Sequence, residues 1–329
     1  MADPRRPSGP GLQIPPVTDD NGGMRTRVAL VAVVVAVGAL AVACTPPPPP
    51  PPDPVAPAPT ARNAAVAVAD FTFTDTSRST PAYDGYPGDD VRTIPTTVWY
   101  PAARSGPYPL VVFAHGFAVD PWFYQSLLEG IASAGYVVVA PTIPLLSGYP
   151  AGPTDTVDWE AHYGDLQFVT SAVLDRSAAG DPVLGGLIDP KRIAVAGHSD
   201  GALLAFGDGL EAGHTDARVR AVIAYAAYLG GGAEYQANGR ALLHFASQND
   251  EYNPFGDTVD WDHSVLGDPS WTVAVWGDSH VPPYTEPADP AFSVVLATTI
   301  DFLDFQLKGQ SEAPFVGDVT GNPALVAFV

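Results

Sequence analysis

The sequence predicts one α/β domain whose central sheet is mostly parallel and carries helices on both faces. Two observations indicate this architecture. Continuous apolar segments of strand length alternate with segments of helical spacing, a pattern typical of buried parallel strands joined by helices. One strand-like segment, residues 193–196, runs through the motif Gly-His-Ser-Asp-Gly at 197–201 into a small apolar stretch, residues 202–206, that can pack as a helix.

Strand, G-x-S-x-G and helix in this order predict a nucleophile elbow, a strained turn that presents its serine at the tip. Gly197 and Gly201 are expected there because the two arms of the turn pass close together, where a Cβ would clash. The motif occurs once in the chain. Ser199 is therefore the candidate nucleophile.

The remaining elements follow from apolar periodicity and from turn residues. Residues 309–329 carry mixed signals and are expected to form a C-terminal extension of the domain. The expected strands are 65–76, 92–100, 109–114, 136–140, 193–196, 219–224, 241–246 and 271–276, and the expected helices are 122–134, 159–174, 202–206 and 292–307.

Residues 1–43 are expected to form a signal segment outside the domain. Their apolar run, 28–43, follows basic residues and is shorter than the ~20 residues of a membrane span. The polar stretch before Met24 is unlike a signal start, which favours Met24 as the translation start. Cys44, the only cysteine, follows Leu-Ala-Val-Ala and resembles the lipidated cysteine of a bacterial lipoprotein box. We expect an exported, lipid-anchored protein, with free secretion after the A-x-A site at 41–43 or an uncleaved anchor as alternatives.

Residues 44–62 are rich in proline, with an unbroken run at 46–52. Such a segment favours an extended spacer of ~3.1 Å per residue, a tail without function being the alternative. The net charge of −21 disfavours nucleic acid and anionic lipid head groups as partners, so membrane contact is expected only through the anchor. A lone cysteine forms no intramolecular disulfide, so the domain, residues 63–329, must be held by its core.

Serine needs a base to take its proton and a third group to orient that base. In an open parallel sheet these groups gather at the carboxyl ends of strands. Asp250 follows the expected strand 241–246, and His280 follows 271–276. The order Ser199, Asp250, His280 is that of the α/β-hydrolase arrangement.

Both partners have rivals. Glu251 and Asp278 are alternative acids, and His263 is the serious alternative base. His198 lies inside the elbow, where its side chain is expected to point away from the reaction. His115 belongs to the turn after the third strand, and His244 is expected in the core. His162 and His214 are expected in helix or loop far from any strand end.

Acyl transfer also requires N–H donors aimed at the developing oxyanion. The amide of Asp200 follows the nucleophile at a helix N-terminus and is one candidate. The loop after the third strand, His115-Gly116-Phe117, supplies the other. We expect the Phe117 amide to donate, with Gly116 allowing close approach of the backbone. The Phe117 ring is expected to form a pocket wall or simply to pack.

Three segments of the chain resemble bacterial α/β-hydrolases near the dienelactone-hydrolase-like, cutinase and polyester-hydrolase branch. They are the strand that ends in His115-Gly116-Phe117, the Ala-Gly-Tyr-Val-Val step at 134–138 and the stretch 189–199. Plant chlorophyllases and plasma-type platelet-activating-factor acetylhydrolases are similar as well. The resemblance spans roughly residues 65–308. It implies an α/β-hydrolase fold, a triad of Ser199, Asp250 and His280, and oxyanion donors at Phe117 and Asp200.

The chain differs from two of these groups at positions that bear on activity. The cysteine nucleophile of dienelactone hydrolases proper is absent. Polyester hydrolases usually carry a bulky apolar residue after the serine and a tryptophan after the next strand. This chain has Asp200 and Tyr-Ala-Ala-Tyr at 225–228 in those places, which argues against polymer or cutin activity. Asp200 also disfavours anionic substrates.

The sequence contains no nucleotide-binding glycine motif and no zinc-ligand spacing, so no cofactor and no metal are expected. Asp257, Asp260 and Asp262 form an acidic loop that suggests calcium only weakly, because their spacing fits no known calcium loop. We therefore expect a serine esterase acting on a small-molecule or lipid-like carboxylic ester through an acyl-enzyme. A peptidase or acyltransferase with the same triad, or a surface lipoprotein without catalysis, are the alternatives.

Overall fold

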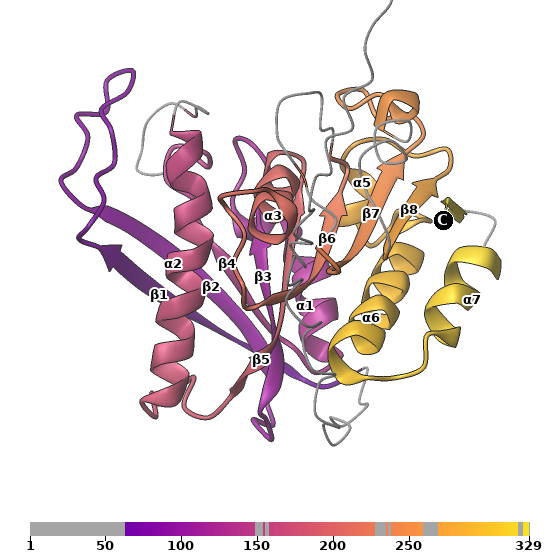
Figure 1. The fold of residues 1–329 in the computed structure, drawn as a ribbon, viewed down its shortest axis with the longest axis horizontal. Helices are drawn as coiled ribbons and strands as arrows, with labels where there is room; N and C mark the ends of the chain where they lie inside the picture. Colours follow the sequence, from indigo (N-terminus) through magenta and orange to yellow (C-terminus); the bar gives the residue numbers. More distant parts are fainter. Residues whose placement is uncertain are drawn as a thin grey trace, which may run out of the picture. The chain divides into compact units, whose positions relative to one another are not determined.

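The computed structural model describes residues 63–148, 154, 158–227, 235, 238–258, 269–321 and 325–328 (Figure 1). The described residues all belong to one compact unit. The expected signal segment, Cys44 and the proline-rich spacer lie outside the described residues. None of the described helices combines the length and the apolar character needed to cross a bilayer.

The described strands form one sheet of nine strands in the order β1-β2-β4-β3-β5-β6-β7-β8-β9. The six strands from β4 to β8 in this order are parallel, and β1, β2 and β9 pair antiparallel at the two ends. The expectation of a mostly parallel sheet is confirmed. The strands are β1 (Val66–Asp75), β2 (Arg92–Pro101), β3 (Tyr108–Ala114), β4 (Val137–Pro141), β5 (Ile188–His198), β6 (Val219–Tyr225), β7 (Ala241–Ser247), β8 (Ser270–Val275) and β9 (Leu325–Phe328).

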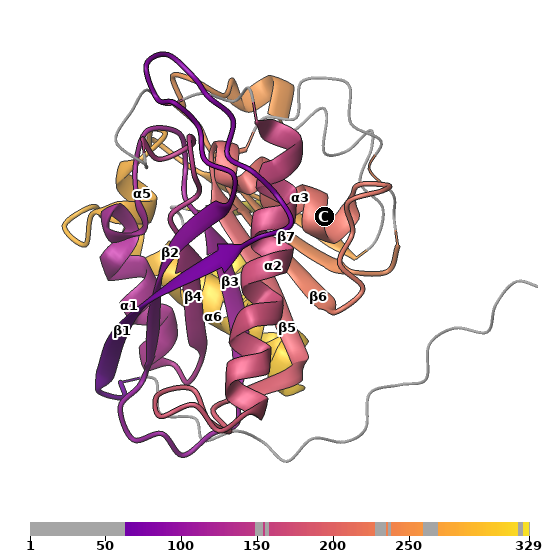
Figure 2. The ribbon, with the colours of Figure 1, turned by 90° about the vertical axis from the view of Figure 1, so that its left-hand side faces the viewer.

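Helices cover both faces of this sheet, and the central strands are apolar on both sides for that reason. In β3, Val111 and Phe113 pack with α1 (Gln125–Ser133) and α6 (Phe292–Lys308). The alternate residues Leu110 and Val112 pack with α2 (Trp159–Ala178) and α3 (Asp200–Leu210) on the opposite face. Figure 2 shows α1 and α2 on opposite sides of the strands. The two-residue period of a strand thus divides the core into two layers.

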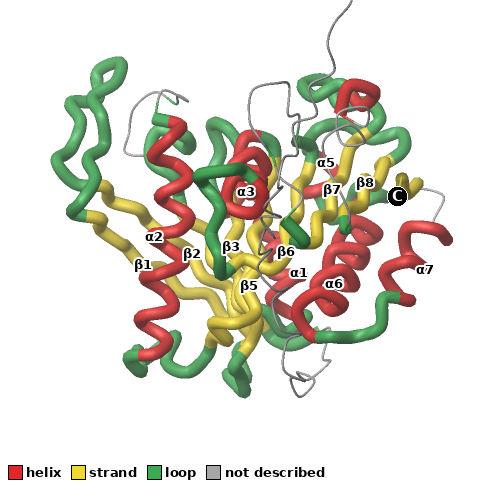
Figure 3. The backbone as a smooth tube through the Cα atoms, in the orientation of Figure 1, coloured by secondary structure: helices red, strands yellow, loops and turns green. Residues whose placement is uncertain are grey.

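Several elements differ in extent from the sequence expectation, as Figure 3 shows by type. The segment expected as one helix at 122–134 is a 3-10 turn, Pro121–Tyr124, followed by α1. Asp120 caps this turn by accepting the N–H of Trp122 at 2.9 Å. A short helix, α5 (Pro282–Thr285), follows the His280 loop.

The C-terminal extension contains regular structure that the sequence did not indicate. Helix α7 (Ala313–Gly321) buries Phe315 and Val319 in the same core layer as α6. Strand β9 then pairs antiparallel with β8, with Val273 opposite Ala327. The extension therefore closes an otherwise open edge of the sheet.

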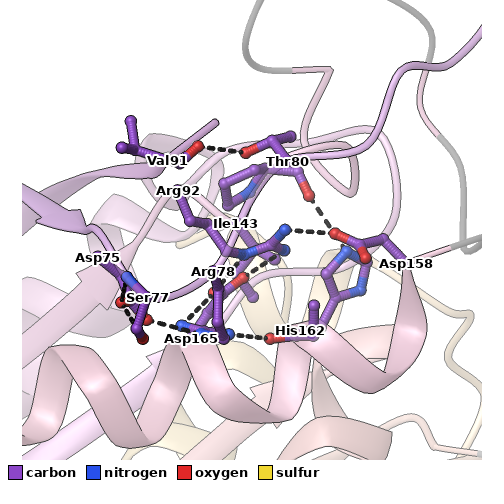
Figure 4. A network of polar contacts seen from close by, with 12 residues as sticks. Asp75, Ser77, Arg78, Thr80, Val91, Arg92, Ile143, Asp158, His162 and Asp165 are labelled. Atoms are coloured by element: carbon purple, nitrogen blue, oxygen red, sulfur yellow. Dashed lines mark hydrogen bonds and ion pairs between the residues drawn. The ribbon is translucent and has the colours of Figure 1, made fainter. Parts of the chain in front are cut away.

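A buried polar network fastens α2 to the other end of the sheet (Figure 4). The guanidinium of Arg92 on β2 binds both carboxylate oxygens of Asp165, at 2.5 and 2.7 Å, and also donates to Asp158. Arg78 adds an ion pair to Asp165 at 3.0 Å and another to Asp75 at 2.6 Å. Arg92 and Asp165 have no accessible side-chain surface, so each charge depends on the other for solvation.

Candidate active site

Ser199 sits at the turn between β5 and α3 with φ 54° and ψ −122°, a left-handed conformation that a residue with a Cβ adopts only under constraint. The flanking glycines show why the turn can form. A Cβ on Gly197 would lie 2.1 Å from the carbonyl oxygen of Gly201, and one on Gly201 would lie 2.1 Å from that of Ala114. The strained, tightly packed turn expected of a nucleophile elbow is therefore present.

His280 and Asp250 follow the neighbouring strands β8 and β7 and meet at the same edge of the sheet. Nδ1 of His280 lies 2.8 Å from Oδ2 of Asp250, and both side chains are buried. The other oxygen of Asp250 accepts the backbone N–H groups of Tyr252 at 2.9 Å and Asn253 at 2.7 Å. These bonds hold the carboxylate in one orientation, so that it in turn orients the imidazole.

The alternative acids Glu251 and Asp278 accept hydrogen bonds from backbone N–H groups. Glu251 accepts the backbone N–H of His280 at 3.2 Å, so it supports the loop and not the ring. Asp278 accepts the N–H of Ser279 at 3.0 Å, and burial, with a contribution from nearby Asp289, raises its pKa to about 6. The rival base His263 lies outside the described residues, as do Asp260 and Asp262 of the acidic loop. Asp257 is exposed.

A pocket of about 430 Å³ opens beside the serine and brings the candidate residues together. Ser199, His280, Phe117 and Asp200 all line it. Most of the remaining wall is apolar or aromatic, and the Phe117 and Tyr252 side chains are 45% and 70% exposed. The other lining residues are Gly116, Val119, Phe123, Tyr124, His198, Asn253 and Val281.

The backbone around Phe117 agrees with its expected role as a donor. The N–H of Gly116 donates to the hydroxyl of Tyr124 at 3.1 Å, and that of Ala118 donates to the carbonyl of Leu146 at 2.9 Å. Within the part of the chain that the structure describes, the intervening N–H of Phe117 has no hydrogen-bond acceptor. The N–H of Asp200 is in the same situation at the start of α3, where the helix dipole also favours negative charge.

His115 holds the loop that carries Phe117. Its Nε2 accepts the N–H of Ile143 at 2.9 Å, so its Nδ1 carries the proton and donates to the carbonyl of Gly116 at 2.8 Å. Burial lowers the pKa of His115 to about 4, so the ring is neutral near pH 7. His115 therefore stabilises the loop and does not act as a base.

The Asp200 carboxyl lines the pocket next to Ser199. Burial raises its pKa, an effect that the nearby His280 partly opposes.

The expectation that His198 points away from the reaction is wrong. Its ring lies 4.7 Å from the ring of His280 between centroids and lines the pocket. Nε2 of His198 donates to the backbone carbonyl of His280 at 2.8 Å, and Nδ1 lies 2.9 Å from the hydroxyl of Tyr124. Sequence reasoning also missed Tyr124, because no local pattern connects it with a residue 74 positions away.

Among the described residues, no group of three His, Cys, Asp or Glu side chains has a geometry that could hold a metal ion. The arrangement of Ser199, His280 and Asp250 instead suits nucleophilic attack by a serine with a histidine base. The two unpartnered amides suit the stabilisation of an oxyanion.

Known proteins resemble this chain in parts of its sequence and in its fold. The family model of chlorophyllase matches residues 89–249. Chlorophyllase-1 of Arabidopsis thaliana is 49% identical over 39 residues, a stretch that makes up 12% of this chain and 12% of that relative. A ferulic acid esterase from Streptomyces cinnamoneus has a similar structure, with a TM-score of 0.63 at 20% identity over 83% of this chain and 98% of the esterase. The likeness to the solved structure shows a shared fold.

Proposed function

We propose that this chain, which has an α/β-hydrolase fold, is a serine-dependent carboxylic ester hydrolase that works through an acyl-enzyme. The observation that carries the proposal is the pocket that both the strained Ser199 and the buried His280 line, with Nδ1 of His280 held 2.8 Å from Oδ2 of Asp250. The structural likeness to an esterase agrees with it.

In the proposed mechanism, Oγ of Ser199 attacks the ester carbonyl carbon while Nε2 of His280 takes its proton. Asp250 holds Nδ1–H of His280 and stabilises the imidazolium. The amides of Phe117 and Asp200 bind the oxyanion of the tetrahedral intermediate. The intermediate collapses, the C–O bond to the alcohol breaks, and His280 returns the proton to that alcohol. Water then repeats the sequence on the acyl-enzyme and releases the carboxylic acid.

The pocket wall indicates the kind of ester. Phe117, Phe123 and Tyr252 offer aromatic surface, and Asp200 adds a carboxyl group that repels anions when it is ionised. An uncharged small-molecule or lipid-like ester fits this wall best.

A fluorophosphonate probe tests the serine mechanism directly. We expect the full chain to be labelled on Ser199, and Ser199→Ala to lose both the label and more than about 10⁴-fold of its kcat on p-nitrophenyl esters. Ser311→Ala, a change at an exposed serine, is the matched control and should keep both. Labelling with turnover of peptide anilides instead of esters would favour a peptidase, and absence of labelling in the wild type would contradict the proposal.

The proposal extends to location: an exported enzyme, tethered by lipid on Cys44. Its support is the apolar run 28–43 directly before the only cysteine and the proline-rich spacer after it. Cells grown with a clickable fatty acid should label the wild type in the membrane fraction. Cys44→Ala should lose that label, and a label that survives this substitution would contradict the anchor.

A further inference from the structure

A chain of hydrogen bonds joins residues of the pocket wall and links three loops. The N–H of Gly116 donates to the Tyr124 hydroxyl at 3.1 Å, and that hydroxyl lies 2.9 Å from Nδ1 of His198. Nε2 of His198 lies 2.8 Å from the backbone carbonyl of His280. The three linked loops carry, in order, the candidate oxyanion donor Phe117, the candidate nucleophile and the candidate base.

The chemistry of the two ends fixes every proton in this chain. A peptide N–H can only donate, so Tyr124 accepts from Gly116 and uses its own proton to donate to Nδ1 of His198. A carbonyl can only accept, so Nε2 of His198 carries the ring proton and donates to His280. This single arrangement needs a neutral His198, and burial lowers the pKa of that ring to about 3. The link is therefore intact at any pH at which an esterase would operate.

Packing leaves little freedom around these bonds. Tyr124 and His198 are buried, and the ring of His198 lies 5.4 Å from the rings of Tyr124 and Tyr284. A Cβ on Gly116 would come within 3.0 Å of the Tyr124 hydroxyl and 3.3 Å of Nδ1 of His198. The Tyr124 hydroxyl thus ties down the Gly116 amide, one residue before the amide expected to bind the oxyanion.

We propose that Tyr124 and His198 are positioning residues for the reaction, an inference that rests on the proposed function of Ser199 and His280. Tyr124 fixes the loop 115–117 so that the Phe117 amide faces the oxyanion. His198 holds the backbone of His280 at a set distance from the elbow that carries Ser199. Together they fix the positions of the Phe117 amide, Ser199 and His280 relative to one another, although neither Tyr124 nor His198 forms or breaks a covalent bond in the reaction.

Tyr124→Phe is the principal test, because it removes one hydroxyl and keeps the ring. We expect kcat to fall about 10- to 100-fold on a short-chain p-nitrophenyl ester. A misplaced oxyanion donor weakens the stabilisation of the transition state but not the binding of the ground state. KM should change less than about threefold. A boronic acid that mimics the tetrahedral intermediate should bind more weakly by a similar factor to kcat.

Tyr284→Phe is the matched control. Tyr284 is also buried, also packs on His198, and its hydroxyl lies 2.8 Å from that of Ser247, so Tyr284→Phe loses one buried hydrogen bond where Tyr124→Phe loses two. We expect both variants to lower the melting temperature, Tyr124→Phe by more, and we expect a change in kcat of less than about threefold for Tyr284→Phe. Equal losses of kcat in both variants, or an unchanged kcat in Tyr124→Phe, would overturn the positioning role.

A second pair tests His198 and serves if Tyr124→Phe does not fold. His198→Gln keeps an N–H that can reach the His280 carbonyl, whereas His198→Leu does not. We expect the glutamine variant to retain at least about tenfold more kcat than the leucine variant, and equal activities would contradict the inference. Fluorophosphonate labelling separates the two proposals. If labelling depends on Ser199 but kcat is the same within each pair of variants, only the positioning role is contradicted. If the wild type is not labelled, both fall.

Discussion

Nδ1 of His280 and Oδ2 of Asp250 lie 2.8 Å apart although their residues are 30 positions apart in the chain, and both side chains are almost inaccessible to solvent. We expect Asp250→Asn to lower kcat/KM by about 10³- to 10⁴-fold, because a neutral amide neither stabilises the imidazolium nor enforces the tautomer that can accept the serine proton. Initial rates on p-nitrophenyl acetate measure this.

Glu251→Gln is the comparison for that variant, because Glu251 contacts only the backbone N–H of His280 among the described groups and glutamine keeps an acceptor. Its kcat/KM should fall less than about tenfold. A larger loss in Glu251→Gln than in Asp250→Asn would assign the orienting carboxylate to Glu251 instead.

Gly201→Ala should disrupt the elbow. The added Cβ would lie 2.1 Å from the carbonyl oxygen of Ala114, and neither backbone segment can move without breaking the sheet. We expect a loss of several kcal/mol in the free energy of unfolding, above the ~1–3 kcal/mol of ordinary overpacking, or no soluble protein at all. Yield and thermal unfolding measure it.

Gly317→Ala is the control substitution. Gly317 lies exposed in α7 with nothing near its Cβ position, so alanine should raise the free energy of unfolding by about 0.5–1 kcal/mol. The clash explanation would fail if the two alanine variants had equal stability.

Arg92→Met should be strongly destabilising. It leaves the buried Asp165 with only the 3.0 Å pair to Arg78, and removing one member of a buried ion pair costs about 3–5 kcal/mol. Arg176→Met removes a surface pair of 2.8 Å to Asp181, in which the arginine is 43% exposed, and should cost about 1 kcal/mol or less. Urea unfolding compares the two, and similar losses would show that the Arg92 network contributes no more than a surface pair.

Asp208 gives the protein a pH-dependent stability. Burial raises its pKa from 3.8 to about 8, so between these values the folded chain holds a proton that the unfolded chain releases. The free energy of unfolding should therefore fall as the pH rises from about 4 to 8, by up to ~1.4 kcal/mol per pH unit from this group. Asp208→Asn keeps an acceptor for Gln167, which donates at 3.0 Å, and does not titrate. Its stability relative to wild type should rise between pH 5 and pH 8 in urea unfolding.

Asp181→Asn is the comparison for this pH effect. The N–H groups of Leu184 and Val183 lower the pKa of Asp181. Its contribution to the free energy of unfolding is therefore present above the ordinary pKa of 3.8 and is lost only as the pH falls through the lowered pKa. The difference between this variant and wild type should stay constant from pH 5 to pH 8. A constant difference for Asp208→Asn as well would show that Asp208 is ionised in the fold.

Much of the fold could be predicted from the sequence because burial constrains which residue types can occur at neighbouring positions. A strand covered on both faces must be continuously apolar, as Val137–Pro141 is, and a tight strand-to-helix turn needs glycine where its arms touch, as at Gly197. Each predicted strand up to residue 276 has a counterpart in the structure. The positions of Asp250 and His280 followed from the same rule, since the carboxyl ends of parallel strands share one edge.

The sequence by itself determined the order of the elements, the elbow at Ser199 and the three candidate side chains, because each is set by local pattern and by position at a strand end. Only the tertiary structure decided that residues 325–328 pair with β8, because the partner of an edge strand comes from a distant segment. The link from Gly116 through Tyr124 and His198 to His280 was likewise decided by packing. Its members share no periodicity, and the bonds at Nδ1 and Nε2 of His198 span 74 and 82 residues of the chain.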